Sequence, residues 1–251
     1  MIPKIIHYCW FGGNPLPELA LKCIESWKKF LPDYEIKEWN ESNYDIRKIQ
    51  YISQAYDAKK YAFVSDYARF DILYEYGGIY FDTDVEVLRS LEEIIKKGAF
   101  AGVECGGALN AGLGLATPAA SPIYKEILES YDKSSFIKKD GSMDLTTVVQ
   151  RVSDIFRKYG FTNNDEIQYV KGITIYPTEY FCPKNYSSGV VNITENSYTI
   201  HHYDGSWTSP FHKQLLIEKQ RIDKRIRNPI LRELFKKLYT FKKIVLEYIY
   251  K

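Results

Sequence analysis

Residues 61–84, YAFVSDYARFDILYEYGGIYFDTD, constrain the fold of this chain more strongly than any other segment. The double glycine Gly77-Gly78 separates a helix-like stretch from a short apolar run. Glycine readily adopts the positive φ that commonly ends a helix. We therefore predict a helix, a tight turn and a buried strand whose exit carries Asp82 and Asp84. Such a place is suited to holding a divalent metal ion and a diphosphate.

The two aspartates form a D-x-D pattern that fits a cation site. Residues i and i+2 of an extended chain lie on the same face, so both carboxylates can address one ion. Hard oxygen ligands suit Mg²⁺ or Mn²⁺, and phosphate oxygens of a ligand can complete the coordination shell. The alternative is a polar turn after a strand. The glycine turn and the apolar run that precede Asp82 and Asp84 favour the metal site.

Strand-like and helix-like segments alternate through the first half of the chain. Strands are predicted at 4–10, 34–39, 79–82, 85–88, 99–103, 113–116, 173–176 and 198–201, and helices at 16–30, 44–76 with a break near 57, 122–131 and 146–159. Asp144 is predicted to cap the last of these helices. The alternation predicts one three-layer α/β domain over residues 1–210, with a mixed, mostly parallel sheet. Ligands of such sheets bind beyond the carboxyl ends of the strands, where the D-x-D pair is placed.

Asp66 and Arg69 are three residues apart on the predicted helix, so they share one of its faces. Arg69 could contact a diphosphate or a sugar through its planar guanidinium, and Asp66 could accept hydrogen bonds from sugar hydroxyls. The alternative is a surface ion pair worth about 0.2–0.5 kcal/mol. The many apolar neighbours of the pair argue against a purely solvated position.

Three further places carry polar or aromatic candidates. Trp10 ends the first predicted strand beside a glycine loop, where it could stack on a nucleobase or fill the core. In the segment HHYDGSW, His201 or His202 could be a third ligand of the cation. Ser206 and Trp207 could contact phosphate through a hydroxyl and an indole N–H. The alternative is a loop with two surface histidines.

Charge divides the chain into a body and a tail. Residues 211–251 carry 12 Lys or Arg and 4 Asp or Glu, a local charge of +8, whereas the rest carries 22 and 28, a local charge of −6. The apolar residues of the tail predict a helical, basic and amphipathic appendage over 211–251. It could lie on an anionic membrane, or it could pack on protein. The acidic body and the lack of a known binding module argue against a nucleic-acid partner.

The sequence favours a cytoplasmic location. The first ten residues lack the apolar stretch of a signal peptide, and no run approaches the ~20 apolar residues that span a bilayer. The four cysteines are scattered and form no C-x-x-C pair, which is typical of a reduced protein with incidental thiols.

Four segments, in this order, resemble the glycosyltransferase family 32 enzymes: IPKIIHYCWFGG, SDYARFDILYEYGGIYFDTD, ALNAGLGLATP and IHHYDGSW. That family includes bacterial transferases of capsule and exopolysaccharide synthesis and fungal mannosyltransferases. It is related to the glucosylating domains of clostridial toxins. The resemblance implies a GT-A-type, Rossmann-like fold and a metal-dependent transfer that retains anomeric configuration.

The resemblance also implies a role for each matching position. The metal ligands are Asp82 and Asp84 with His201, or with His202 as the less favoured choice. The catalytic residues are Asp66, Arg69, Asp82, Asp84 and Asn110, of which Asn110 faces the reacting sugar. The donor-binding residues are Trp10, Gly12, Asp66, Arg69, Asp82, Thr83, Ser206 and Trp207.

The expected reaction is transfer of a hexose from a nucleotide sugar to a glycan, with Mn²⁺ or Mg²⁺ as cofactor. A UDP-sugar is the favoured donor, and the acceptor is expected to be a lipid-linked intermediate of capsular or extracellular polysaccharide. The tail would then hold the enzyme on the inner face of the plasma membrane. The alternatives are a GDP-mannose-dependent mannosyltransferase and a metal-dependent nucleotidyltransferase or phosphotransferase. The last would usually need a phosphate-binding G-x-x-x-x-G-K-[ST] loop, which the sequence lacks.

Overall fold

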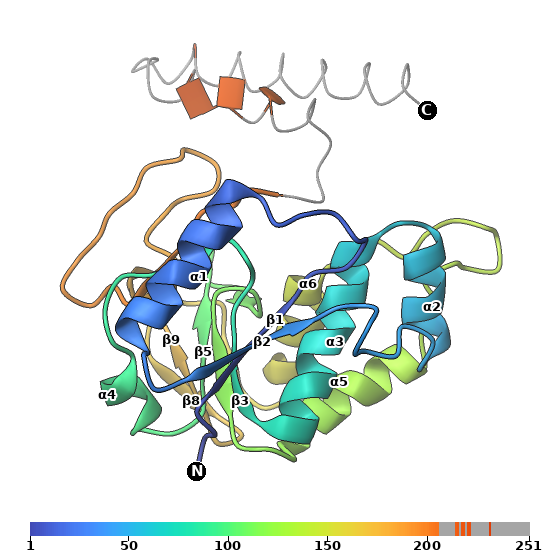
Figure 1. Ribbon diagram of the computed structural model, residues 1–251, viewed down its shortest axis with the longest axis horizontal. Helices are drawn as coiled ribbons and strands as arrows, with labels where there is room; N and C mark the ends of the chain where they lie inside the picture. Colours follow the sequence, from blue (N-terminus) through green and yellow to red (C-terminus); the bar gives the residue numbers. More distant parts are fainter. Residues whose placement is uncertain (206–213, 216, 219, 222–230, 232–251) are drawn as a thin grey trace. The chain divides into compact units, whose positions relative to one another are not determined.

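A computed structural model describes residues 1–205, 214, 215, 217, 218, 220, 221 and 231 (Figure 1). The chain divides into two compact units. The first comprises Met1–Pro183 and Asn192–His202, and the second comprises Lys184–Val191 and the chain from Tyr203 onward. The predicted boundary after residue 210 and most of the predicted tail, 211–251, lie outside the described residues. No helix among the described residues is long and apolar enough to cross a membrane.

An eight-stranded sheet forms the centre of the first unit, and a two-stranded sheet accompanies it. The strands of the large sheet are β1 (Ile5–Cys9), β2 (Glu35–Trp39), β3 (Gly78–Tyr80), β5 (Phe100–Val103), β6 (Leu109–Asn110), β7 (Leu115–Thr117), β8 (Gln168–Val170) and β9 (Ile173–Tyr176). Their order is β2-β1-β3-β7-β5-β9-β8, and β6 pairs with β5. The small sheet pairs β4 (Val85–Val87) with β10 (Thr199–His201).

Helices lie on both sides of the strands in the view of Figure 1. They are α1 (Glu18–Phe30), α2 (Gln50–Asp57), α3 (Tyr61–Tyr76), α4 (Glu92–Ile95), α5 (Pro122–Asp132), α6 (Val148–Arg157) and α7 (Thr178–Phe181). Helices α2, α3, α5 and α6 gather on the right, and α1 lies on the left. The predicted α/β class is confirmed, and each predicted helix and strand is present, although the helix predicted from residue 44 begins only at Gln50. The short elements α4, α7, β6 and β8 were not predicted. The break near Asp57 is also confirmed, since α2 ends there.

The predicted dominance of parallel pairs is wrong, because among the described residues the large sheet has three parallel and four antiparallel strand pairs. Strands β1–β2, β1–β3 and β5–β9 pair in parallel, whereas β3–β7, β5–β6, β5–β7 and β8–β9 are antiparallel. For the pair β8–β9 the reason is the length of the connection. Only two residues join β8 to β9, and so short a loop can join only antiparallel strands, because a parallel pair needs a long crossover.

Helix α6 does not begin as predicted. Its N-cap is Thr147, whose side chain accepts a hydrogen bond from the backbone N–H of Gln150, so the cap assigned to Asp144 is wrong. Asp144 lies three residues earlier, where its carboxylate accepts from the Thr146 hydroxyl at 2.7 Å. Arg151 Nη2 lies 3.4 Å from the same carboxylate. Asp144 therefore stabilises the loop before the helix through these contacts with Thr146 and Arg151.

The glycine turn after α3 is present as predicted. Gly77 and Gly78 have φ values of +66° and +98°, which disfavour any residue with a side chain. A Cβ on Gly77 would also lie 2.7 Å from the backbone nitrogen of Ala119. Helix α3 can therefore reverse directly into β3, which carries the chain to Asp82.

A buried histidine lies beneath this turn. Trp39 Nε1, which can only donate, lies 3.0 Å from His7 Nδ1, so that ring nitrogen is the acceptor. His7 Nε2 then carries the proton and donates to the Gly77 carbonyl at 2.9 Å. Burial lowers the pKa of His7 from 6.5 to about 4, and the Gly77 bond only partly offsets this. The neutral ring thus joins β1, β2 and the turn.

Acid should destabilise the protein through His7. Above pH 6.5 the ring is neutral in both states, whereas between 6.5 and 4 only the unfolded chain takes up the proton, so stability is lost as the pH falls. Between pH 7 and pH 4 the wild type should lose about 3 kcal/mol more unfolding free energy than His7→Gln. Urea unfolding of both proteins across this range measures the difference, and parallel stability curves would contradict it.

Candidate functional site

The D-x-D pair occupies the turn between β3 and β4. The backbone N–H of Asp82 donates to the Gly112 carbonyl at 3.1 Å, and the N–H of Val85 donates to the Asp82 carbonyl at 3.0 Å. These bonds fix the backbone on both sides of Thr83. The side chains of Asp82 and Asp84 are partly exposed, so both can reach a ligand.

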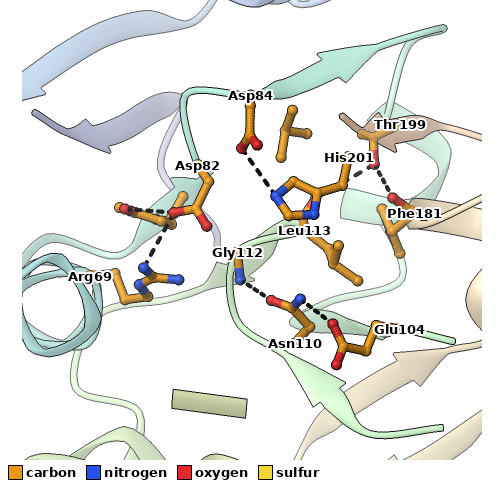
Figure 2. Close-up of polar contacts among 12 residues, drawn as sticks. Arg69, Asp82, Asp84, Glu104, Asn110, Gly112, Leu113, Phe181, Thr199 and His201 are labelled. Carbon is orange, nitrogen blue, oxygen red and sulfur yellow. Dashed lines mark hydrogen bonds and ion pairs between the residues drawn. The ribbon is translucent and has the colours of Figure 1, made fainter. Parts of the chain in front are cut away.

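Strand β10 brings His201 to these aspartates. The antiparallel register with β4 places His201 opposite Val85, next to Asp84. His201 Nε2 lies 3.0 Å from Asp84 Oδ1 (Figure 2). The ligand atoms of Asp82, Asp84 and His201 all lie within 4.8 Å of one another. Two carboxylates and an imidazole at this spacing fit a divalent cation such as Mn²⁺.

His202 is directed elsewhere. Its Nε2 lies 2.8 Å from Glu86 Oε2, and Lys22 Nζ lies 3.0 Å from the same oxygen. His202 follows β10, which ends at His201, and its ring pairs with Glu86. Of the two candidates, the structure brings only His201 to Asp82 and Asp84.

Arg69 and Asp66 lie side by side on α3, and Arg69 also reaches the turn. Arg69 Nη2 is 2.9 Å from Asp66 Oδ1 and 3.3 Å from Asp82 Oδ1. The Arg69 side chain is only 5% exposed, so this is a buried ion pair and not a solvated one. Tyr80 donates its hydroxyl to Asp82 Oδ1 at 3.1 Å. Asp82 is thus held by two side chains as well as by its backbone.

The electrostatics of this group favour a fixed positive charge. Burial opposes the ionisation of Arg69, but Asp82, Tyr80 and Asp66 together raise its pKa above the ordinary value. Burial raises the pKa of Asp66 to about 6, although Arg69 acts in the opposite direction. Burial also opposes the charge on His201, and Asp84 outweighs it, so the pKa of His201 is raised.

Asn110 lies below the turn at the end of β6, and it is buried. Its Nδ2 donates to Glu104 Oε2 at 2.7 Å, and its Oδ1 accepts from the Gly112 N–H at 2.8 Å (Figure 2). Burial raises the pKa of Glu104, and the bond from Asn110 acts against this. Sequence reasoning missed Glu104. The signal was an acid between the strand predicted at 99–103 and a glycine-rich loop.

Trp10 and Gly12 belong to the loop after β1. Since β1 and β3 pair in parallel, Trp10 and Asp82 follow the carboxyl ends of neighbouring strands at the same edge of the sheet. The Trp10 indole donates to the Asn14 carbonyl at 2.6 Å, and the Gly12 N–H donates to Glu41 Oε1 at 2.6 Å. Ser206 and Trp207 lie outside the described residues.

Comparison with known proteins gives one family match. Residues 17–101 match the glycosyltransferase sugar-binding region containing a DXD motif. The matched segment contains Asp66, Arg69, Asp82 and Asp84.

Two curated relatives come from Schizosaccharomyces pombe. Inositol phosphoceramide mannosyltransferase 3 is 35% identical over 102 residues, which are 38% of this chain and 27% of the relative. Inositol phosphoceramide mannosyltransferase 1 is 28% identical over 110 residues, which are 39% of this chain and 33% of the relative. The chain therefore spans about a third or less of the length of these relatives.

Among solved structures, the chain is similar to the galactosyltransferase LgtC in complex with donor and acceptor sugar analogues. That likeness has a TM-score of 0.46 and 14% identity, and it covers 89% of this chain and 96% of the other.

Proposed function

We propose that this chain, which belongs to the family of glycosyltransferases with a DXD-containing sugar-binding region, transfers a hexose from a nucleotide sugar to a glycan. The observation that carries the proposal is the convergence of Asp82, Asp84 and His201 beside the buried Arg69. The fold we propose is of the GT-A type, and the transfer retains anomeric configuration, as the sequence resemblance implies.

Asp82, Asp84 and His201 would hold a divalent cation, Mn²⁺ or Mg²⁺. When bound, such an ion neutralises the charge that develops on a leaving diphosphate. Arg69 supplies a second positive charge at the same place. Because two carboxylates already fix its guanidinium, that charge requires no reorganisation during the reaction.

The remaining donor contacts are proposed from the resemblance and from position. Asp66 would accept hydrogen bonds from hydroxyls of the donor sugar, beside Arg69. Trp10, at the end of the neighbouring strand, would stack on the nucleobase. Gly12, which has no side chain, would let the loop come close to the donor. Ser206 and Trp207 would contact the diphosphate.

Two donors compete. The sequence favours a UDP-hexose by analogy. The mannosyltransferase names of both curated relatives favour GDP-mannose, although they come from proteins that this chain covers only in part. The proposed acceptor is a lipid-linked glycan of capsular or extracellular polysaccharide synthesis. A hexosyl group of either kind can use the same metal and arginine site.

Release of UDP or GDP from nucleotide sugars tests the function and identifies the donor. With Mn²⁺ and acceptor present, we expect release from one hexose donor and a loss of that release when EDTA is added. A metal-dependent phosphotransferase or nucleotidyltransferase would instead consume nucleoside triphosphates. Absence of release from every UDP- and GDP-hexose, with such consumption present, would overturn the proposal.

The basic tail, 211–251, would bring the enzyme to the cytoplasmic face of an anionic membrane, where a lipid-linked acceptor lies. Its local charge of +8 supports this part of the proposal. Vesicles that contain phosphatidylserine should carry the whole chain upward in a flotation gradient, and vesicles of phosphatidylcholine should not. Equal recovery with the two vesicle types would contradict it.

A further inference from the structure

We propose that Glu104 is a positioning residue of the metal site, which acts through Asn110 and Gly112 on Asp82. This inference rests on the proposed function, because a fixed Asp82 matters only where that carboxylate binds a cation. Glu104 lies outside the ligand group of Asp82, Asp84 and His201, and it follows β5, on the opposite side of the Asn110 carboxamide from the turn (Figure 2).

The hairpin of β5 and β6 creates the pair. Gly102 lies directly opposite Asn110, and Val103 lies opposite Leu109. Because side chains alternate along a strand, Gly102, Glu104 and Asn110 share one face of the hairpin. On this face the carboxamide of Asn110 reaches Glu104, where Nδ2 and Oε2 are 2.7 Å apart.

The polarity of the partners gives Asn110 a single orientation. An ionised carboxylate can only accept, so Glu104 must face the Asn110 NH₂ group. The backbone N–H of Gly112 can only donate, so it must face Asn110 Oδ1, at 2.8 Å. The carboxamide therefore cannot rotate by half a turn without placing like groups against each other at both ends.

Gly112 transmits this order to Asp82. Its carbonyl accepts from the Asp82 N–H at 3.1 Å, and an ideal Cβ on Gly112 would lie only 2.0 Å from Asp82 Oδ2. The backbone of Gly112 thus lies next to the Asp82 carboxylate with no room for a side chain between them. A shift of this backbone therefore displaces Asp82 Oδ2.

The next residue connects the same loop to the strand of the third ligand. The hydroxyl of Thr199, which is buried on β10 two residues before His201, contacts the carbonyls of Leu113 at 3.5 Å and of Phe181 at 3.1 Å (Figure 2). The loop that Glu104 and Asn110 hold therefore touches the supports of both Asp82 and His201.

Variants of the whole chain test the inference through Mn²⁺ binding, measured by electron paramagnetic resonance, and through thermal unfolding. Loss of an outer partner of a metal ligand commonly costs about 10–100-fold in metal affinity. We expect Glu104→Leu to raise the Kd for Mn²⁺ about tenfold. Glu104→Gln keeps an acceptor oxygen for Asn110 and should stay near the wild type. Glu129→Leu removes an exposed charge on α5 and is the control for net charge.

A polarity swap makes the test independent of the folding of Glu104→Leu. Asn110→Asp sets two carboxylates against each other and should weaken Mn²⁺ binding about as much. Combining Glu104→Gln with Asn110→Asp restores the hydrogen bond with its direction reversed. The new carboxamide at position 104 then donates, while the new carboxylate at position 110 still accepts from the N–H of Gly112. This double variant should recover most of the lost affinity.

Wild-type affinity in Asn110→Asp, or a double variant as weak as Asn110→Asp, would overturn the inference while leaving the proposed function in place. Failure of the proposed function has a different signature, because the wild type would then release no UDP or GDP from any nucleotide hexose and would consume nucleoside triphosphates instead.

Discussion

Asp84→Asn should reduce metal-dependent sugar transfer about 10³-fold. The substitution keeps the shape of the side chain but removes the charge that lies 3.0 Å from His201 and within 4.8 Å of the other ligand atoms. Nucleotide release at a series of Mn²⁺ concentrations measures the effect. We expect the apparent Mn²⁺ affinity to fall together with the maximal rate, because Asp84 is proposed as a ligand.

Glu86→Gln is the matched control. Glu86 lies two residues after Asp84 and pairs with His202 at 2.8 Å. The substitution therefore removes a comparable carboxylate that does not belong to the ligand group. This variant should keep the wild-type rate and the wild-type Mn²⁺ dependence. Wild-type turnover of Asp84→Asn in saturating Mn²⁺ would refute the assignment of the metal site.

The local part of this site could be predicted because its signals are local. Helix periodicity, the double glycine and the alternation after it all act within a few residues, and they place Asp66, Arg69, Asp82 and Asp84 on a helix, a turn and a strand exit. The sequence left open whether Asp66 and Arg69 form a surface pair. The 5% exposure of Arg69 answers that question in favour of a buried pair.

The missing parts depend on pairing between distant segments. His201 lies more than a hundred residues from Asp84, and only the register of β10 on β4 decides that it, and not His202, faces the aspartates. Glu104 could not be recognised because only the β5–β6 hairpin places it beside Asn110. Strand β6 has two residues, which are too few to be recognised by alternation. The number of antiparallel pairs in the sheet was underestimated for the same reason, since the direction of strand pairing follows from connections that periodicity does not reveal.

Gly112→Ala should lower metal-dependent transfer at least about 100-fold without unfolding the protein. Gly112 does not have the positive φ that excludes alanine, so its backbone tolerates the change. The new Cβ, however, would lie 2.0 Å from Asp82 Oδ2, and contacts of this kind are essentially never below 3.0 Å. The carboxylate must therefore move by about 1 Å, and a misplacement of that size in a reactive site costs roughly 10²-fold.

Gly102→Ala is the matched change on the neighbouring strand β5. Its backbone also lies outside the positive-φ region, but its Cβ would meet the Phe181 ring at 2.9 Å and not a ligand of the cation. We expect Gly102→Ala to lower the unfolding temperature with little change in Mn²⁺ affinity. Gly112→Ala should weaken Mn²⁺ binding with little change in the unfolding temperature. Thermal unfolding and Mn²⁺ titration of both proteins separate the two effects. Equal Mn²⁺ affinity in Gly112→Ala and the wild type would show that Asp82 Oδ2 is not a ligand. A loss of Mn²⁺ affinity in Gly112→Ala but not in Gly102→Ala would mean that the missing side chain of Gly112, beneath the turn, sets the position of that oxygen.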